Sequence, residues 1–571
     1  MTEKETCVEK SPSLTPPSLF KLNLKGSKIE LKEHQIEHND ILNKIMLKYP
    51  VVCDFSVMGS GKSFVSSNIA LTNELKFKHV IVVGPLSIQS DWNIKKNRYK
   101  VPIHTFISYQ SLRSVKGQFN LKHGLLNRFD SIRTKIHDGR EITVNIIEFK
   151  ATELYKKLVE EGLLLIIDEI QNAKNLTTQF LACKELIKEI VGNCNFINKP
   201  VNNSRVILLS GTPFDKKNQI VNFLRLINLM KDNNLCEYSV STQFNIWTGF
   251  NDILKVSKNI DKVKTNGICY LTENTGKTNE LINIVYDIFQ NIIKQRISHS
   301  MPPIKLDVSI DKKNAFYHIF DDDSRQLLEQ AVIGLKKVLR YNNVTRNIEF
   351  NNNENILSKI QSHLHSIETA KIKTFARITK EILDNDPNSK IVVCLNYILP
   401  LQDLYNELKQ YNPLLISGCV KSKDRATMIE LFQQHNSKYR LIIAISAVVC
   451  EGINLDDQDG NYPRYCFINP NYSTIRMCQL SDRFRRALTK SDSVVHFVYG
   501  KHACELNLLD ALARKSTIMK ETTPEQVEAG MLFPVDYNYF IEKTDEDLNK
   551  DILIYLNKNG KQNKSTEEEE E

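Results

Sequence analysis

The sequence predicts an α/β protein with two domains, each built on a parallel β-sheet, and a mostly helical region between them. Short apolar runs that suit buried strands alternate with stretches that suit helices, which is the pattern of parallel strands covered on both faces. The runs fall into two groups, one before about Met230 and one after about Asn355. After a first run at 51–55, they are 80–83, 163–167, 206–209, 391–395, 441–445 and 494–498.

The chain is therefore divided into five segments. The leader is polar and rich in Pro and Ser, and the last five residues are all glutamate, a like-charge block; we expect both ends to be disordered. The segments are the leader (1–24), the first α/β domain (25–230) with a basic insertion at about 113–150, the linking region (231–355), the second α/β domain (356–515) and a C-terminal extension with the acidic tail (516–571).

The composition is that of an ordinary globular protein. Hydrophobic residues make up 41% and charged residues 25% of the 571 residues, close to the average for such proteins. The net charge of +9 permits a polyanionic partner without requiring one. No apolar run approaches the ~20 residues that cross a bilayer, so we expect no membrane contact. The twelve cysteines include no C-x-x-C pair, and no secretory signal is visible, which predicts free thiols and an intracellular location in cytoplasm or nucleus.

A phosphate-binding loop follows the first strand-like run. Residues 56–63 read Ser-Val-Met-Gly-Ser-Gly-Lys-Ser and lead into a helix-compatible stretch, 64–75. Strand, glycine loop and helix is the order that a P-loop requires. The glycines let backbone N–H groups turn toward phosphate oxygens, and the helix N-terminus adds positive charge.

Individual residues of this loop have predictable roles in binding ATP and Mg²⁺. Lys62 can reach the β- and γ-phosphates, and the Ser63 hydroxyl can ligate Mg²⁺. Ser56 replaces the first glycine of the strict pattern. The predicted nucleotide-binding residues are Ser56, Met58, Gly59, Ser60, Gly61, Lys62 and Ser63.

Two adjacent carboxylates, Asp168 and Glu169, directly follow the strand-like run 163–167. Ligands bind at the carboxyl ends of parallel strands. In isolation such a pair is commonly a helix N-cap with a first-turn acid. Together with the P-loop, it predicts that Asp168 holds Mg²⁺ and that Glu169 orients and deprotonates the attacking water.

With these two motifs, an ordered series of further motifs resembles superfamily 2 helicases and translocases. Within that superfamily it resembles the Swi/Snf-like branch and the related NTPases of large DNA viruses, of the poxvirus early-transcription type. The resemblance spans roughly residues 31–500. In the first domain, residues 31–35 resemble the motif whose glutamine reads the adenine edge, which assigns Gln35. Residues 83–87 with Trp92, and residues 108–112, resemble motifs that contact the nucleic-acid backbone, which assigns Pro85, Ser87 and Ser108.

The remaining motifs assign residues for coupling and for the second domain. Residues 210–213 resemble the motif that couples hydrolysis to domain movement, which assigns Ser210 and Thr212; Gln171 stands where this branch usually carries histidine and can hydrogen-bond to either. Residues 446–455 resemble a motif that touches both backbone and nucleotide. This motif assigns Ser446 and Asn454 to nucleic acid and Gly452 to the nucleotide. The family's Gln-x-x-x-Arg-x-x-Arg spacing assigns Gln479 to coupling and Arg483 and Arg486 as arginine fingers.

The resemblance implies two RecA-like domains that form a nucleotide cleft. It implies an ATP hydrolase that uses Mg²⁺ and moves on nucleic acid, and we expect the track to be duplex DNA. An RNA helicase remains an alternative. A second alternative is a viral-type transcription factor subunit whose nucleotide gates contact with RNA polymerase or a promoter; a viral protein of this kind would be found in the virion. Asp482 stands where many superfamily 2 helicases carry glycine, which suits the Swi/Snf-like branch.

Overall fold

The computed structural model divides the chain into two compact units. The first unit contains residues up to Lys305 together with Thr517–Leu532, and the second contains Leu306–Ser516 and the residues from Phe533 on. The leader and the acidic tail predicted from the sequence lie outside the described residues. The described residues are 29–113, 122–137, 140–192, 200, 202–230, 237–239, 244–246, 248–256, 277–303, 308–319, 321–342, 347–350, 356–435, 437–450, 453–486, 488–500, 502–528, 530 and 532–534.

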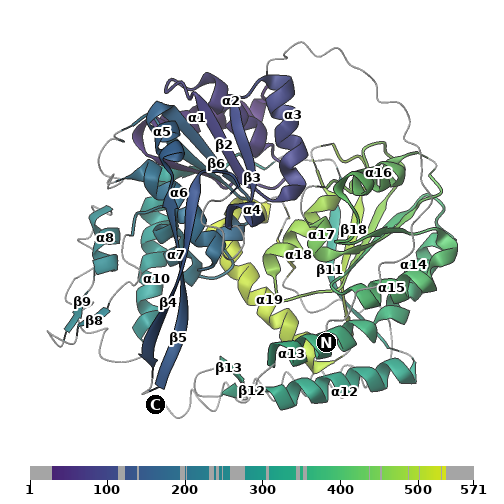
Figure 1. The fold of residues 1–571 in the computed structure, drawn as a ribbon. Helices are drawn as coiled ribbons and strands as arrows, with labels where there is room; N and C mark the ends of the chain where they lie inside the picture. Colours follow the sequence, from purple (N-terminus) through teal and green to yellow (C-terminus); the bar gives the residue numbers. More distant parts are fainter. Residues whose placement is uncertain are drawn as a thin grey trace, which may run out of the picture. The chain divides into compact units, whose positions relative to one another are not determined.

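The first unit is built on a six-stranded parallel sheet in the order β10-β1-β7-β6-β2-β3 (Figure 1). Its strands are β1 (Val51–Asp54), β2 (His79–Gly84), β3 (Ile103–Ser108), β6 (Leu163–Asp168), β7 (Arg205–Leu209) and β10 (Ser298–His299). Its helices are α1 (Glu33–Lys48), α2 (Lys62–Thr72), α3 (Gln89–Tyr99), α4 (Tyr109–Arg113), α5 (Glu153–Gly162), α6 (Thr178–Val191), α7 (Asn218–Leu226), α8 (Thr248–Val256), α10 (Lys277–Ile288), α11 (Lys294–Ile297) and α20 (Pro524–Glu528).

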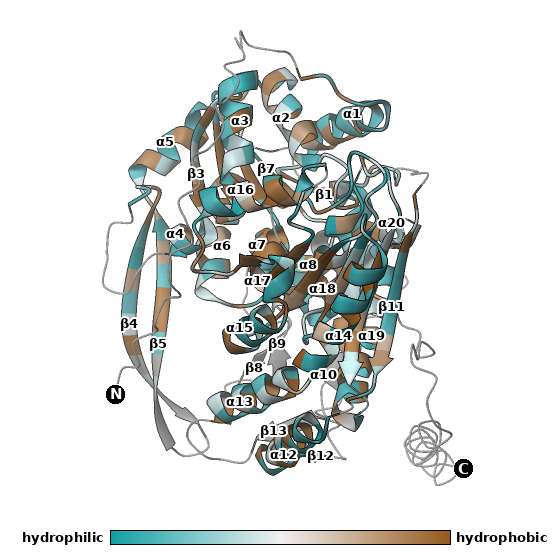
Figure 2. Ribbon diagram, turned by 90° about the vertical axis from the view of Figure 1, so that its right-hand side faces the viewer, coloured by the Kyte–Doolittle hydropathy of each residue, from teal (hydrophilic) through white to brown (hydrophobic). Residues whose placement is uncertain are grey.

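Helices cover both faces of this sheet because its strands are apolar on both sides. Successive residues of a strand point to opposite faces. Val51 and Cys53 belong to one buried cluster together with α5, α6 and α7, whereas Val52 belongs to a second cluster with α1, α2 and α3. Figure 2 shows the consequence as brown strands between helices of mixed teal and brown. The predicted pattern of buried parallel strands is confirmed in this unit.

The basic insertion predicted at about 113–150 contains a two-stranded antiparallel ribbon. Its strands are β4 (Leu126–His137) and β5 (Arg140–Ala151), paired from Leu126 opposite Ala151 to His137 opposite Arg140. The ribbon extends away from the sheet (Figures 1 and 2). Leu126 and Phe149, near its base, are buried in the cluster that contains α6, while Ile132 is 71% exposed. A second small hairpin joins β8 (Glu237–Ser239) and β9 (Phe244–Ile246).

The second unit contains another six-stranded parallel sheet, in the order β11-β18-β17-β14-β16-β15. Its strands are β11 (Ile310–Tyr317), β14 (Lys390–Leu395), β15 (Leu414–Ile416), β16 (Leu441–Ile445), β17 (Arg464–Ile468) and β18 (Ser493–Gly500). The other elements are a hairpin of β12 (Leu339–Asn342) and β13 (Asn347–Phe350), and the helices α12 (Asp322–Val338), α13 (Ile356–Thr369), α14 (Ile372–Asn385), α15 (Ile398–Glu407), α16 (Ser422–Gln433), α17 (Ser446–Val449), α18 (Thr474–Ser481) and α19 (Ala503–Thr522), whose last residues belong to the first unit.

The stretch expected to be a mostly helical linking region, 231–355, adds one edge strand to each sheet. β10 pairs in parallel with Cys53 and Asp54 of β1, and β11 pairs along its whole length with β18. Neither strand has a continuous apolar run, because β10 is two residues long and the first half of β11 reads Ile-Asp-Lys-Lys. The stretch also contains the helices α10 and α12. Among the described residues, no helix has both the length and the hydropathy that crossing a bilayer requires.

The second unit should lose stability on acidification because of His496 in β18. Burial, together with the charge of Lys313, lowers the pKa of His496 to about 4, whereas an unfolded histidine titrates near 6.5. The unfolded chain therefore takes up the proton first. The resulting loss in the free energy of unfolding is absent above about pH 6.5 and grows to about 3 kcal/mol as the pH falls toward 4. We expect the urea midpoint of His496→Gln to fall less than the wild-type midpoint between about pH 7 and about pH 4.5.

The matched control for this measurement is His435→Gln, which alters an exposed histidine of the same unit. Its urea midpoint should follow the wild-type pH dependence. An identical pH dependence in all three proteins would show that His496 does not contribute.

Candidate nucleotide site

The predicted P-loop connects β1 to α2 and has the backbone that two glycines allow. Gly59 and Gly61 have φ values of 79° and 91°, which a side chain on Cα disfavours. Gly61 is the N-cap of α2, so Lys62 and Ser63 lie in the first turn of that helix. A Cβ atom on Gly61 would lie 2.2 Å from Gln35 Nε2. The backbone conformation therefore requires glycine here, and a side chain would also displace the end of Gln35.

Gln35 and Lys62 both contact the loop backbone. The side chain of Gln35 is buried and donates from Nε2 to the Ser60 carbonyl at 2.9 Å, while its Oε1 accepts from the Lys32 N–H at 2.9 Å. Lys62 Nζ donates to the carbonyls of Ser56 and Val57, at 2.9 and 3.2 Å. The ammonium group of Lys62 is thus held inside the curve of the loop.

The other predicted P-loop residues shape the loop. Ser60 is buried and donates its hydroxyl to the Val57 carbonyl at 2.7 Å, and Met58 is also buried. The Ser63 carbonyl accepts from the Ser67 hydroxyl at 2.7 Å, within α2. Ser63 itself is partly exposed.

The acidic pair lies at the same edge of the sheet as the P-loop. β7 separates β1 from β6, and Leu209 is the register partner of Asp54 on one side and of Asp168 on the other. The last residue of β1 and the first acid of the pair therefore lie at the same level of the sheet, with one strand, β7, between them. This arrangement brings together the two motifs that the sequence had placed more than a hundred residues apart.

Asp168 is a carboxylate whose surroundings favour a cation. Its Oδ2 accepts from Trp92 Nε1 at 3.0 Å. Burial and the neighbouring charge of Glu169 raise the pKa of Asp168 to about 7, which means that its negative charge is under-compensated. A magnesium ion would supply that compensation, and Asp168 and Ser63 are the side chains placed to hold it. In the described residues there is no group of three or more His, Cys, Asp or Glu suited to a metal; magnesium bound with a nucleotide needs only one or two protein ligands, because phosphate oxygens and water complete its shell.

Glu169 has an unusual backbone conformation, with φ 59° and ψ 54°. Non-glycine residues in this region are uncommon and gather at functional sites. The Tyr109 hydroxyl lies 2.9 Å from the carbonyl of Asp168 and 3.0 Å from that of Glu169, and so supports the turn. Sequence reasoning had placed Trp92 and Tyr109 only in motifs for nucleic acid, and their contacts with the acidic pair were missed.

A line of hydrogen bonds connects Glu169 to the motif at 210–213. Gln171 Nε2 donates to Glu169 Oε2 at 2.6 Å, and the Ser210 hydroxyl donates to Gln171 Oε1 at 2.7 Å. The Thr212 N–H in turn donates to the Ser210 hydroxyl at 3.0 Å. The contact between Gln171 and Ser210 is one of the two that the sequence allowed. A shift of the 210–213 turn would therefore move Gln171 and, through it, the Glu169 carboxylate.

In the second unit, Arg483 is bound by its own backbone surroundings. It is buried and donates from Nε to the Cys450 carbonyl at 2.9 Å and from Nη1 to the Ile453 carbonyl at 3.3 Å. Arg486 is partly exposed. Asp482, buried beside them, pairs with Lys312 of β11 at 2.7 Å; burial raises the pKa of Asp482 and the Lys312 charge opposes this. Gln479 is buried, and Gly452 lies outside the described residues.

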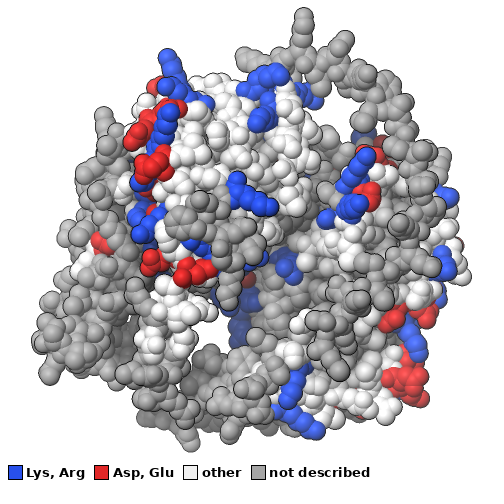
Figure 3. Space-filling view, in the orientation of Figure 1, with Lys and Arg blue, Asp and Glu red and all other residues white. Residues whose placement is uncertain are grey.

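The five residues predicted to contact nucleic acid differ in exposure. Asn454 is exposed, whereas Pro85, Ser108 and Ser446 are buried; Ser87 is partly exposed, but its hydroxyl is buried. In this structure the side chains of the buried residues are therefore not accessible to nucleic acid. On the face shown in Figure 3, basic groups gather over α3, where Lys96, Arg98 and the following Lys100 are exposed.

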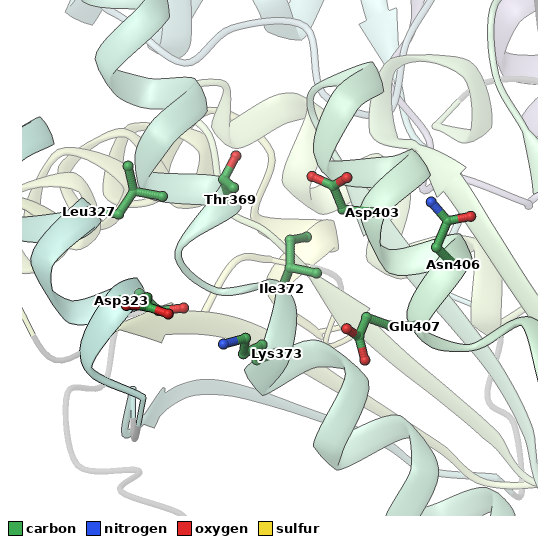
Figure 4. Close-up of a pocket in the computed structure, with 9 residues that line it drawn as sticks. Asp323, Leu327, Thr369, Ile372, Lys373, Asp403, Asn406 and Glu407 are labelled. Atoms are coloured by element: carbon green, nitrogen blue, oxygen red, sulfur yellow. The ribbon is translucent and has the colours of Figure 1, made fainter.

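A separate pocket of about 380 Å³ lies in the second unit, between α12, α14 and α15. Leu327 and Ile372 supply apolar walls, and Asp323, Asp403 and Glu407 make the lining acidic (Figure 4). None of the residues predicted from the sequence lines this pocket.

Comparison with known proteins gives no match to any protein-family model and none to any curated protein. Many solved structures are similar to this chain, among them two of a Sulfolobus solfataricus SWI2/SNF2 ATPase core. The core in complex with dsDNA has 16% sequence identity and a TM-score of 0.27, with 91% of this chain and 99% of that chain covered. The core domain alone has 16% identity and a TM-score of 0.28, with 91% and 97% covered.

Proposed function

We propose that this protein is an ATP- and Mg²⁺-dependent nucleic-acid motor of the superfamily 2 type, with duplex DNA as its track. The observation that carries the proposal is that the P-loop and the Asp168–Glu169 pair follow the carboxyl ends of β1 and β6, which lie level on either side of β7, at the edge of the sheet where ligands bind. A glycine turn with no role in nucleotide binding would not require two carboxylates at the same edge of the sheet, with one strand between them and the turn.

The chain's own residues divide the work of hydrolysis. When bound, ATP supplies the phosphoryl group and Mg²⁺ neutralises part of its charge. Lys62 turns from the carbonyls of Ser56 and Val57 toward phosphate oxygens. Asp168 and Ser63 would hold the ion. Glu169, on the strained turn, takes the proton of the attacking water.

Closure of the second unit on the first would complete the site. In this proposal, Arg483 and Arg486 approach the phosphates and neutralise charge in the transition state. The hydrogen bonds from Glu169 through Gln171 to Ser210 connect the hydrolytic site to the 210–213 turn. A change in the position of Glu169 during hydrolysis would therefore move this turn, which links hydrolysis to domain movement. Backbone N–H groups and basic side chains such as those of α3 would bind phosphates of the track, which predicts little sequence preference and strong salt dependence.

The test is the steady-state ATPase rate without polymer and with duplex DNA, single-stranded DNA, duplex RNA or single-stranded RNA, with Glu169→Gln as the blank. Stimulation by duplex DNA supports the proposal. Stimulation by RNA alone indicates the RNA helicase alternative. Equal low rates throughout indicate a nucleotide-gated subunit that requires a protein partner such as an RNA polymerase. Full activity of both Lys62→Ala and Glu169→Gln would exclude a P-loop ATPase.

Trp92→Phe should weaken the response to magnesium, because Asp168 loses the indole N–H that orients it. Partners of this kind commonly contribute about 10-fold to metal affinity. We therefore expect the Mg²⁺ concentration for half-maximal ATPase activity to rise about 10-fold. The chain has two tryptophans, so Trp247→Phe is the matched control and should titrate like the wild type. Indistinguishable titrations of the two variants would contradict the role given to Trp92.

A further inference from the structure

A buried network beneath the P-loop involves residues that none of the recognised motifs assigns. Asp54, the last residue of β1, is fully buried. Its Oδ1 accepts from the Ser56 N–H at 3.0 Å and also from the Ser56 hydroxyl. Its Oδ2 lies 3.1 Å from His38 Nε2 in α1, in an ion pair that solvent does not reach on either side. A buried carboxylate without partners would destabilise the fold. The contacts with Ser56 and His38 offset that cost for Asp54.

Ser56 transmits the position of Asp54 to Lys62. Its N–H is bound by Asp54, its carbonyl accepts from Lys62 Nζ at 2.9 Å, and its hydroxyl accepts from the Met301 N–H at 2.8 Å. Both ends of this residue are thus fixed. Glycine, the usual residue at this position of a P-loop, has no hydroxyl with which to make the contacts to Asp54 and Met301.

The histidines hold Asp54 from the other side and connect it to β10. His38 Nδ1 lies 2.7 Å from His299 Nδ1, and the two rings stack with centroids 5.0 Å apart. Two ring nitrogens at this distance share one proton, so only one of them is the donor. Burial alone would raise the pKa of Asp54, but the charges of His38 and Lys62 lower it, so Asp54 remains ionised.

We propose that Asp54 and His38 are positioning residues for nucleotide binding: through Ser56 they fix the first turn of the P-loop and so place Lys62. This inference rests on the proposed function, because it takes Lys62 as a phosphate ligand. Neither residue touches the nucleotide. Their effect should therefore fall on affinity for the nucleotide more than on kcat at saturation.

The experiment compares Asp54→Asn and His38→Gln with matched controls from a second histidine–acid pair in the same unit. That pair is His79 Nε2 and Glu161 Oε2, 2.8 Å apart, and the controls are His79→Gln and Glu161→Gln. The measurements are the Kd of a fluorescent ATP analogue with Mg²⁺, kcat at saturating ATP, and the thermal unfolding midpoint. Loss of a hydrogen bond to a charged group corresponds to about 10-fold in affinity. We expect Asp54→Asn to raise Kd by about 10-fold, His38→Gln to raise it in the same direction, and the controls to leave it unchanged.

A double variant separates positioning from a general loss of packing. The proposal assigns part of the effect to the Ser56 hydroxyl, which Ser56→Gly removes while the N–H contact with Asp54 remains, so Asp54→Asn should raise Kd less in a Ser56→Gly background than in the wild type. Equal increases in both backgrounds would overturn the proposal. If Asp54→Asn fails to fold, His38→Gln and its control His79→Gln decide the question, since a Kd equal in both would also overturn it.

Lys62→Ala distinguishes failure of this inference from failure of the proposed function. If Lys62→Ala binds and hydrolyses ATP like the wild type, the proposed function is wrong. If Lys62→Ala loses hydrolysis while Asp54→Asn and His38→Gln match their controls, only the positioning role is wrong.

Discussion

Replacement of Glu169 by glutamine is expected to lower kcat for ATP hydrolysis by about 10²–10⁴-fold, the usual contribution of a general base. Glutamine has nearly the same shape and can keep the contact with Gln171, but it cannot accept the proton of the attacking water. Nucleotide affinity should change little, because the phosphates are bound by the P-loop and Lys62. The measurement is single-turnover ATP hydrolysis together with binding of a fluorescent ATP analogue.

The control for this prediction is Glu160→Gln, which removes an exposed acid from α5 in the same unit. It should hydrolyse ATP like the wild type. A Glu169→Gln protein that binds ATP and turns it over at the wild-type rate would show that another group is the base. The backbone of Glu169 would then have to be explained without catalysis.

Interior strands could be predicted from the sequence because burial on both faces demands a continuous apolar run. The runs 163–167 and 441–445 coincide with β6 and β16 almost residue for residue. Edge strands could not be predicted in the same way. β3 is half exposed along its middle, and β11 begins with charged residues, because one side of each strand has no neighbour.

β17 was also missed, although it lies inside the second sheet and its last four residues read Tyr-Cys-Phe-Ile. It begins with Arg464, which is almost fully buried. Its guanidinium donates to the carbonyls of Leu455 and Tyr462 and to Gln433 Oε1, and lies 3.6 Å from an Asp457 oxygen. The carbonyls, the amide oxygen and the carboxylate around Arg464 thus allow a charged side chain to be buried at the start of an interior strand.

In the candidate site, features made by residues close in sequence could be predicted, whereas contacts between residues far apart in the chain could not. Its loop residues could be predicted because a P-loop is a local arrangement of strand, glycines and helix. The Trp92 indole meets Asp168 across 76 positions, and His38 meets His299 across 261. Such contacts depend on how helices pack on the sheet, so no spacing rule reveals them.

Arg486 and Arg483 should behave differently when each is replaced by alanine. Both fit the spacing of arginine fingers, but Arg483 is buried against the carbonyls of Cys450 and Ile453, while Arg486 is partly exposed. We expect Arg486→Ala to lower kcat by about 10³–10⁵-fold, the value of an arginine that neutralises charge in phosphoryl transfer. Its thermal unfolding midpoint should remain near that of the wild type.

Arg483→Ala should lower stability as well as activity. It leaves buried carbonyls without donors, at a cost of about 1–3 kcal/mol for each group. Arg485→Ala, between the two, is the matched control and should retain both stability and the ATPase rate. The two effects are separated by measuring urea unfolding and kcat at saturating ATP for all three variants. If Arg486→Ala hydrolyses ATP as fast as Arg485→Ala, Arg486 does not contact the transition state, because an arginine that neutralises the transferring phosphoryl group cannot be removed without a loss of rate.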